Sequence, residues 1–194
     1  MDEPDSLDVT ACERCPALVA SRSRIVNGVG PSDADLLFVG EAPGEQEDRD
    51  GKPFVGRSGD VLDDGLRDAG LARADVRITN CVRCRPPDNR DPSGDELTNC
   101  RSYLNREIDG VDPAVIVTLG KIPSEHLLGR DVAVTNEAGS IEEISIGGAT
   151  RRVLVSVHPA ATLYDRSQRD TFTATIQRAA DMAGDGGQAE LGDF

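Results

Sequence analysis

The sequence has almost no lysine and no long apolar run. Lys52 and Lys121 are its only lysines, and arginine supplies the other basic side chains. No stretch approaches the roughly 18 continuous apolar residues of a membrane span. The first residues, MDEPDSLDVTACERC, are acidic where a secretory signal is basic and then apolar. We therefore expect a cytoplasmic protein that has no membrane partner.

Acidic side chains outnumber basic ones. The 194 residues include 35 Asp and Glu against 21 Lys and Arg, which gives a formal net charge of -14. This balance alone argues against a nucleic-acid partner, because affinity for phosphate depends on basic side chains. A surface rich in acids and poor in lysine is, however, typical of salt-loving organisms, and in molar salt the Debye length falls to about 3 Å. The local placement of arginines then matters more than the total charge. The alternative is that the carboxylates only keep the protein soluble.

Apolar, β-branched runs alternate with helical patterns along the chain. The predicted strands are 36–39, 76–79, 115–119 and 153–157. A helix is expected after Ser93, where Glu96 completes a capping box. Another is expected after Ser58 and ends at Gly70. The segment SIGGATRR predicts a hairpin that places Ile141–Ile146 beside the fourth strand. The alternation favours an α/β fold with a largely parallel sheet covered by helices.

The length fits one domain, since domains usually hold roughly 100 to 200 residues. We assign residues 1–183 to it and find no internal repeat or low-complexity linker. Residues 184–194, GDGGQAELGDF, carry few apolar side chains that could anchor them, so we expect a disordered C-terminal tail.

Three different polar side chains follow predicted strands. Glu41 follows the first, Asn80 the second and His158 the fourth. In open parallel sheets ligands bind outside the carboxyl ends of the strands, so a carboxylate, an amide and an imidazole are expected to converge on one crevice. Taken singly, each has a simpler interpretation: a solvated loop acid, a turn former, and a hydrogen-bonded residue before a proline. Their shared placement favours a functional site.

Five cysteines in a cytoplasmic chain seldom form disulfides. Cys12 and Cys15 form a C-x-x-C motif, and Cys84 and Cys100 flank a polar loop far downstream. Four thiolates in this arrangement suit a tetrahedral zinc or an iron–sulfur cluster. The alternative is four unrelated buried thiols. Cys81, inside a strand run, is interpreted as a small buried hydrophobic residue.

Three longer motifs resemble one enzyme family. They are GEAPGEQEDRDGKPFVGRSG at 40–59, TNCVRCRPPDNRDPSGDELTNC at 79–100 and SVHPA at 156–160. In this order, and with the four cysteines around them, they resemble the family-4 uracil-DNA glycosylases, the iron–sulfur type found in bacteria and archaea. The resemblance covers about residues 11–183, and the composition points to a halophilic archaeon. It implies a three-layer α/β/α fold with a central, mainly parallel β-sheet.

The resemblance implies a DNA repair enzyme that hydrolyses the N-glycosidic bond of uracil, the first step of base excision repair. The base must be flipped out of the stack before that bond can be reached. By the resemblance, Phe54 stacks on the extruded uracil and Asn80 reads its Watson–Crick edge. Cytosine would leave the Asn80 amide mismatched, at a cost of order 1 to 3 kcal/mol for each buried unpaired group. His158 then stabilises the anionic oxygen of the departing base.

Other positions of the first motif also have counterparts in the family. Glu41 matches a position linked to positioning water or balancing the cationic sugar, and Glu47 one that lines the pocket near C5 of the base. Bulk at that point would exclude the methyl group of thymine. The backbone amides of Gly40, Ala42 and Gly44 are candidates for contacting uracil.

The resemblance also implies a cofactor and a DNA-facing edge. It favours a 4Fe–4S cluster over zinc, held by Cys12, Cys15, Cys84 and Cys100, with Cys81 as a substitute ligand. The candidate DNA contacts are Arg57, Ser58, Arg85 and Arg166, within a wider basic rim that adds Arg83, Arg90 and Arg169. The alternative for each arginine is an ordinary surface ion pair that has no role in DNA binding. We expect a monomer that binds uracil-containing DNA and passes its product to abasic-site repair enzymes.

Two alternatives frame this hypothesis. A relative that bonds covalently to DNA carries a His-containing basic insert after the GxPFVG element, and GRSGDVLDD has none, so simple hydrolysis is expected. A non-catalytic iron–sulfur or zinc module that binds nucleic acid or passes electrons would keep the cysteines. Such a module would not need Phe54, Asn80 or His158.

Overall fold

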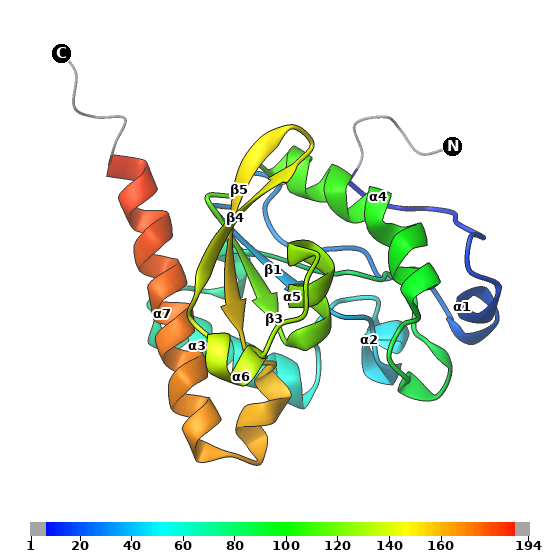
Figure 1. The fold of residues 1–194 in the computed structure, drawn as a ribbon. Helices are drawn as coiled ribbons and strands as arrows, with labels where there is room; N and C mark the ends of the chain where they lie inside the picture. The colour runs from blue at the N-terminus through cyan, green and yellow to red at the C-terminus, as the bar shows by residue number, and fades with distance from the viewer. Residues whose placement is uncertain (1–6, 189–194) are drawn as a thin grey trace.

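A five-stranded sheet forms the centre of the protein (Figure 1). The computed structural model describes residues 7–188. Its strands are β1 (Leu36–Gly40), β2 (Arg77–Asn80), β3 (Val115–Leu119), β4 (Ile141–Ile146) and β5 (Ala149–Ser156). Their order is β2-β1-β3-β5-β4; all neighbours are parallel except β4, which pairs antiparallel with β5. The predicted α/β fold, its mainly parallel sheet and the hairpin are confirmed.

Helices connect the strands. They are α1 (Pro16–Ser21), α2 (Glu45–Asp50), α3 (Arg57–Asp68), α4 (Gly94–Val111), α5 (Lys121–Leu128), α6 (Val134–Glu137) and α7 (Arg166–Gln188), with 3-10 turns η1 (Arg73–Asp75), η2 (Pro87–Asn89) and η3 (Pro159–Leu163). The Ser93 hydroxyl accepts a hydrogen bond from the Glu96 amide, which confirms the predicted cap of α4. Among the described residues, no helix is long and apolar enough to cross a membrane. Helix α7 includes the start of the predicted tail, and 189–194 lie outside the described residues.

The sheet is covered on both faces. In β1 the side chains of Leu36 and Phe38 pack with residues of α3 and α7, whereas Leu37 and Val39 pack with residues of α4 and α5. This alternation is what a strand buried on two sides requires. Figure 1 shows the same arrangement, with α3 and α7 on one side of the sheet and α4 and α5 on the other. The three layers leave the carboxyl ends of the parallel strands free to form a site.

A buried ion cluster ties β2 to α4 and corrects one expectation. Arg83, expected on a basic rim, is only 2% exposed, and its Nη2 lies 2.6 Å from Glu107 Oε2. Arg77 Nε lies 2.8 Å from the other oxygen of the same carboxylate, and Arg83 also donates to Asn27. Arg83 therefore belongs to the protein interior and not to a DNA-facing rim, because its side chain, in the loop after β2, pairs with Glu107 of α4.

Candidate active site

The polar side chains that follow the parallel strands meet at one cavity. Glu41 follows β1, Asn80 ends β2, and His158 lies two residues beyond β5. The cavity has a volume of about 220 Å³. It is lined by Glu41, Ala42, Gly44, Glu47, Phe54, Ser58, Asn80 and His158. All of the side chains assigned to base binding from the sequence thus surround a single space, which Ser58, expected at the DNA, also borders.

Close packing at Gly40 sets the positions of two side chains that line the cavity. Gly40 pairs with Asn80 across the β1–β2 ladder. A Cβ at Gly40 would stand 2.4 Å from Asn80 Oδ1 and 2.4 Å from Phe54 Cε2. Any larger residue would displace the amide and the ring together. The glycine is therefore required by the proximity of two side chains that face the cavity.

The aromatic wall of the cavity is Phe54, which is held in a left-handed backbone conformation at φ 51°. Its carbonyl oxygen packs against Gly59 of α3, where a Cβ would come within 1.9 Å of it. Arg73 donates to the carbonyl of Pro53 and pairs with Asp63 of α3 at 2.9 Å. Strained conformations of this kind persist where the surroundings over-determine them, often at functional sites. Sequence reasoning did not identify Arg73 as a support.

His158 is neutral and its tautomer is fixed. Burial lowers its pKa below the ordinary value. Its Nδ1 accepts a hydrogen bond from the Ala160 amide at 3.0 Å, so the proton of the neutral ring resides on Nε2. The ring centroids of His158 and Phe54 are 5.9 Å apart. The arrangement presents an N–H donor beside the aromatic wall.

Glu41 shares its environment with a second carboxyl group that the sequence did not reveal. Burial raises the pKa of Glu41 to about 7, with further contributions from the charge of Asp91 and a hydrogen bond to its side chain. Asp91 belongs to the loop before α4, where Arg90 donates to the Asp91 carbonyl and to both oxygens of Glu96. Two carboxyl groups in contact share a proton more readily than they both ionise. Only the folded loop brings them together.

Helix α2 and its N-cap residue contribute to the cavity wall. Glu47 Oε2 accepts a hydrogen bond from the Gly44 amide at 3.1 Å, so the carboxylate is held at the start of this helix. Glu47 and Gly44 both border the cavity. This contact fixes the Glu47 side chain beside the cavity.

The four cysteines of the expected ligand set also line one space. A small cavity is bordered by Cys12, Cys15, Cys84 and Cys100, with Leu18 and Val82 among its apolar neighbours. Arg22 donates to Cys84 Sγ at 3.0 Å, and Asn99 to Cys15 Sγ at 3.5 Å. Within residues 7–188, no group of three or more His, Cys, Asp or Glu side chains is arranged to hold one metal ion. The thiols surround a common space without meeting at one point.

Cys81 lies outside this set. It is fully buried and packs with Leu37, Val39 and Leu104 on the α4 face of the sheet. Burial raises the pKa of its thiol well above the ordinary range. Cys81 is therefore a core residue, which confirms its interpretation as a small buried hydrophobic side chain.

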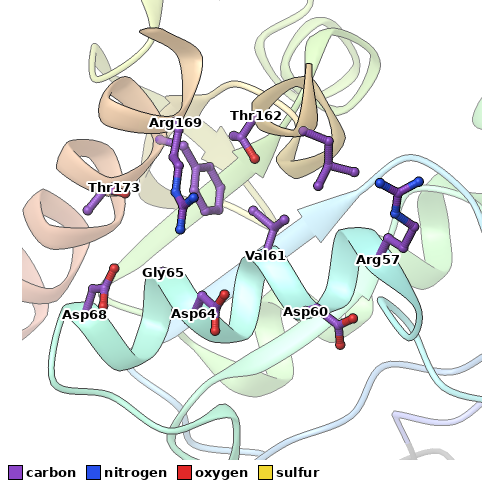
Figure 2. Close-up of a pocket in the computed structure, with 11 residues that line it drawn as sticks. Arg57, Asp60, Val61, Asp64, Gly65, Asp68, Thr162, Arg169 and Thr173 are labelled. Carbon is purple, nitrogen blue, oxygen red and sulfur yellow. The ribbon is translucent and has the colours of Figure 1, made fainter. Parts of the chain in front are cut away.

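Arginines without partners gather beside the active-site cavity. A second hollow of about 350 Å³ runs between α3 and α7, and Arg57 and Arg169 lie on its two sides (Figure 2). Arg166 begins α7, one turn earlier than Arg169. Within the described part of the chain, these three side chains make no hydrogen bond or ion pair.

The other arginines of the expected rim are engaged. Arg85 donates to Asn89 Oδ1 at 2.8 Å and lies 3.7 Å from Glu45. Arg90 is held by Glu96 at 2.8 Å. The unpaired arginines of the expected rim therefore lie at the start of α3 and of α7, beside a hollow that Asp60, Asp64 and Asp68 also line.

Comparisons with known proteins agree with this geometry. The family model described as "Uracil DNA glycosylase superfamily" matches residues 27–180, which include the sheet and the whole active-site cavity. The superfamily is thus the class that the fold and the site define.

Curated relatives narrow the assignment. A type-4 uracil-DNA glycosylase of Archaeoglobus fulgidus is 35% identical over 91% of this chain and 90% of its own. The type-4 enzyme of Thermotoga maritima is 41% identical, over 82% and 81%. A type-5 uracil-DNA glycosylase of Thermus thermophilus is 32% identical, over 91% and 95%. The chain belongs to the uracil-DNA glycosylase superfamily and, within it, to the type-4 enzymes.

Proposed function

We propose that this uracil-DNA glycosylase excises uracil from DNA in the cavity between Phe54, Asn80 and His158. The observation that carries the proposal is the convergence of these three side chains, from three separate segments, on one cavity at the carboxyl edge of the sheet. The products are free uracil and an abasic site. A non-catalytic module would have no use for this cavity.

Each side chain has a distinct task. The Phe54 ring stacks on the flipped base, and the Asn80 amide both donates to and accepts from its Watson–Crick edge. As the glycosidic bond breaks, negative charge develops on a uracil oxygen, and the Nε2–H of neutral His158 donates to it. A neutral donor fixed in advance costs no reorganisation during the reaction, which is the usual source of oxyanion stabilisation.

The carboxylates complete the site. We assign Glu41, once ionised, to orienting the attacking water or balancing the cationic sugar, and Glu47 to excluding a methyl group at C5. We also assign the backbone amides of Gly40 and Ala42 to the base as further donors, whereas the Gly44 amide already donates to Glu47.

The decisive experiment is excision from an oligonucleotide that holds a single uracil, followed by alkaline cleavage of abasic sites. The parent is expected to give strand scission at high salt, and no scission at any salt concentration would overturn the proposal. Asn80→Ala should lose most of the activity, since the base is no longer read. Asn136→Ala, an exposed position on α6, is the matched control and should behave like the parent.

The free arginines supply the DNA-facing edge. We assign Arg57, Ser58 and Arg166 to phosphate contacts and add Arg169, since the three arginines have no partner within the described chain. Arg85 contributes less, because its guanidinium is already bonded to Asn89. Substituting any one of these arginines should weaken DNA binding without changing the identity of the excised base.

We further propose that Cys12, Cys15, Cys84 and Cys100 hold a 4Fe–4S cluster. The residues fit such a group: all four thiols border one space, and two receive N–H hydrogen bonds. When bound, the cluster would link the N-terminal segment to α4. Purified protein should contain iron and absorb broadly in the visible region, whereas zinc without iron would contradict the assignment.

Three wider expectations complete the proposal. The acidic, lysine-poor composition supports activity at high salt, as in a halophilic archaeon. All the residues assigned to catalysis come from one chain, which supports a monomer. Because the product is an abasic site, the reaction that follows must be cleavage and repair of that site.

A further inference from the structure

Helix α2 forms a wall of the active-site cavity although it has no apolar side chain. Its sequence is EQEDRD, and Asp48 is its only buried residue, with 3% of its surface exposed. Short helices are normally held to a protein by an apolar face, since isolated helices of this length are unstable in water. A polar contact must therefore fix α2 in place.

That contact joins α2 to the segment that follows α1. The two carboxylate oxygens of Asp48 accept hydrogen bonds from the Ser23 amide, each at 2.9 Å, and Oδ1 also accepts from the Arg24 amide at 3.3 Å. Hydrogen bonds to an ionised acceptor are stronger than neutral ones and fix geometry. The carboxylate thus takes the place of an apolar face.

The same segment is tied to the cysteine cavity. Arg22, which precedes the two amides, donates from Nη1 to Cys84 Sγ at 3.0 Å and from Nη2 to the Cys12 carbonyl at 2.7 Å. The other polar contacts of α2 are weak: Arg49 and Glu45 pair within the helix at an exposed surface, and Arg85 approaches Glu45 only to 3.7 Å. Asp48 is therefore the strong polar link between α2 and the segment after α1, beside the packing of Ala42 against Leu18, Val82 and Cys84 that joins the two sites directly.

We propose that Asp48 is a positioning residue that transmits the position of the cysteine-bearing segment to the wall of the uracil cavity. Glu47 is its neighbour in the chain and holds the Gly44 amide, so a shift of α2 moves the cavity wall directly. This inference rests on the proposed uracil site. It assigns Asp48 no contact with substrate and no chemical step.

The first test is a comparison of Asp48→Ala with Asp50→Ala, an exposed position on the same helix. For the single-uracil oligonucleotide, Asp48→Ala should raise KM at least about tenfold and reduce the preference for uracil over thymine, because the wall no longer holds the base. Asp48→Asn should fall between parent and Asp48→Ala, since its Oδ1 still accepts one hydrogen bond. Asp50→Ala should match the parent.

The second test does not depend on activity. Amide hydrogen exchange in Asp48→Asn should increase together in residues 21–24 and 41–50 and stay unchanged in α3. If Asp48→Ala fails to fold, the Asn variant provides both the kinetic and the exchange readout. A parent-like KM with parent-like exchange in 41–50 would overturn the inference. A parent that does not excise uracil while exchange rises as expected would instead overturn the proposed site and leave the connection intact.

Discussion

At the scale of single residues, the site depends on positions where geometry leaves little choice. Gly40 admits no side chain because Asn80 and Phe54 occupy the space, and Phe54 keeps a left-handed backbone because its carbonyl packs against Gly59. These contacts fix the amide and the ring before any base arrives. A site organised in this way favours a planar ligand between Phe54 and Asn80. The two side chains lose little conformational entropy when the ligand binds, because they are already fixed.

Glu41 provides a prediction of pH dependence. Its pKa of about 7 means that the carboxyl is protonated below that pH and ionised above it. The rate of excision in single turnovers should therefore rise through about pH 7 and then level off, because the ionised form orients water or balances the sugar. Burial lowers the pKa of His158, so this side chain does not account for a rise in rate near pH 7.

The matched variant is Asp91→Asn. Removing the Asp91 charge should move the midpoint of the profile to lower pH, but only part of the way to the ordinary Glu value, because burial is the largest cause of the shift. A rate that is flat between about pH 5 and 9 would contradict the role of Glu41. An unchanged midpoint in Asp91→Asn would remove Asp91 from the explanation.

Residues that follow strands could be located from the apolar pattern, Phe54 and Glu47 only from the family resemblance, and Asp91 from neither. Glu41, Asn80 and His158 follow apolar runs, and strand ends in a parallel sheet meet at one edge. Asp91 reaches Glu41 through a loop whose course has no periodic pattern. Arg83 was misplaced because it also follows a strand, and nothing in the sequence links it to Glu107 on α4.

At the scale of elements, the pairing of β2 with α4 depends on one buried carboxylate. Glu107 is completely buried and forms ion pairs with Arg77 and Arg83. Glu107→Gln should lower the free energy of unfolding by about 3–5 kcal/mol, because two buried guanidinium groups lose their counter-charge. Denaturant titration measures the loss. The control Glu143→Gln, on the exposed surface of β4, should change the stability little. Equal stability of Glu107→Gln and Glu143→Gln would show that the buried ion cluster is dispensable.

The segment after α1 offers a prediction about the cluster. Arg22 donates to Cys84 Sγ, and hydrogen bonds to ligand sulphurs raise the reduction potential of iron–sulfur centres. Arg22→Met should therefore lower the potential and speed the loss of visible absorption in the presence of a chelator. Arg24→Met is the control, since the Arg24 guanidinium has no polar partner among the described residues. An identical potential and decay in both variants would refute this role of Arg22.

Elements with an apolar pattern could be predicted, and polar elements could not. The strands and α4 follow from β-branched runs and a capping box. Helix α2 has no apolar spacing, and its N-cap Gly44 has no capping side chain. In the structure the Glu47 side chain bonds the Gly44 amide, and Asp48 anchors the helix. Because α2 has no apolar side chain, its sequence shows no helical pattern, and the helix is anchored by a carboxylate in place of an apolar face.

At the scale of the whole molecule, a net charge of -14 must coexist with binding to a polyanion. Each neutralised phosphate contributes a slope of roughly -0.9 to the dependence of log affinity on log salt. The three unpaired arginines assigned to the DNA-facing edge, Arg57, Arg166 and Arg169, predict a slope of roughly -2.7, which is shallow enough for binding to persist at high salt. Fluorescence anisotropy over a salt series measures it.

The variants for this test follow from the structure. Combining Arg57→Gln with Arg169→Gln should make the slope shallower by the contribution of about two phosphates, roughly 1.8. Arg67→Gln, on α3 but paired with Asp64 at 2.8 Å, should leave the slope unchanged. Equal slopes in all three proteins would place the phosphate contacts elsewhere.

The cysteine cavity also sets a schedule for biosynthesis. Cys15 leaves the ribosome 85 residues ahead of Cys100, and all four thiols border the same space only in the folded chain. At roughly 5–20 residues per second, the C-x-x-C pair waits about 4–17 s for its partners. During that interval the two leading thiols are exposed to oxidants and to competing metals in the cell. We therefore expect the proposed cluster to assemble only after α4 has been synthesised.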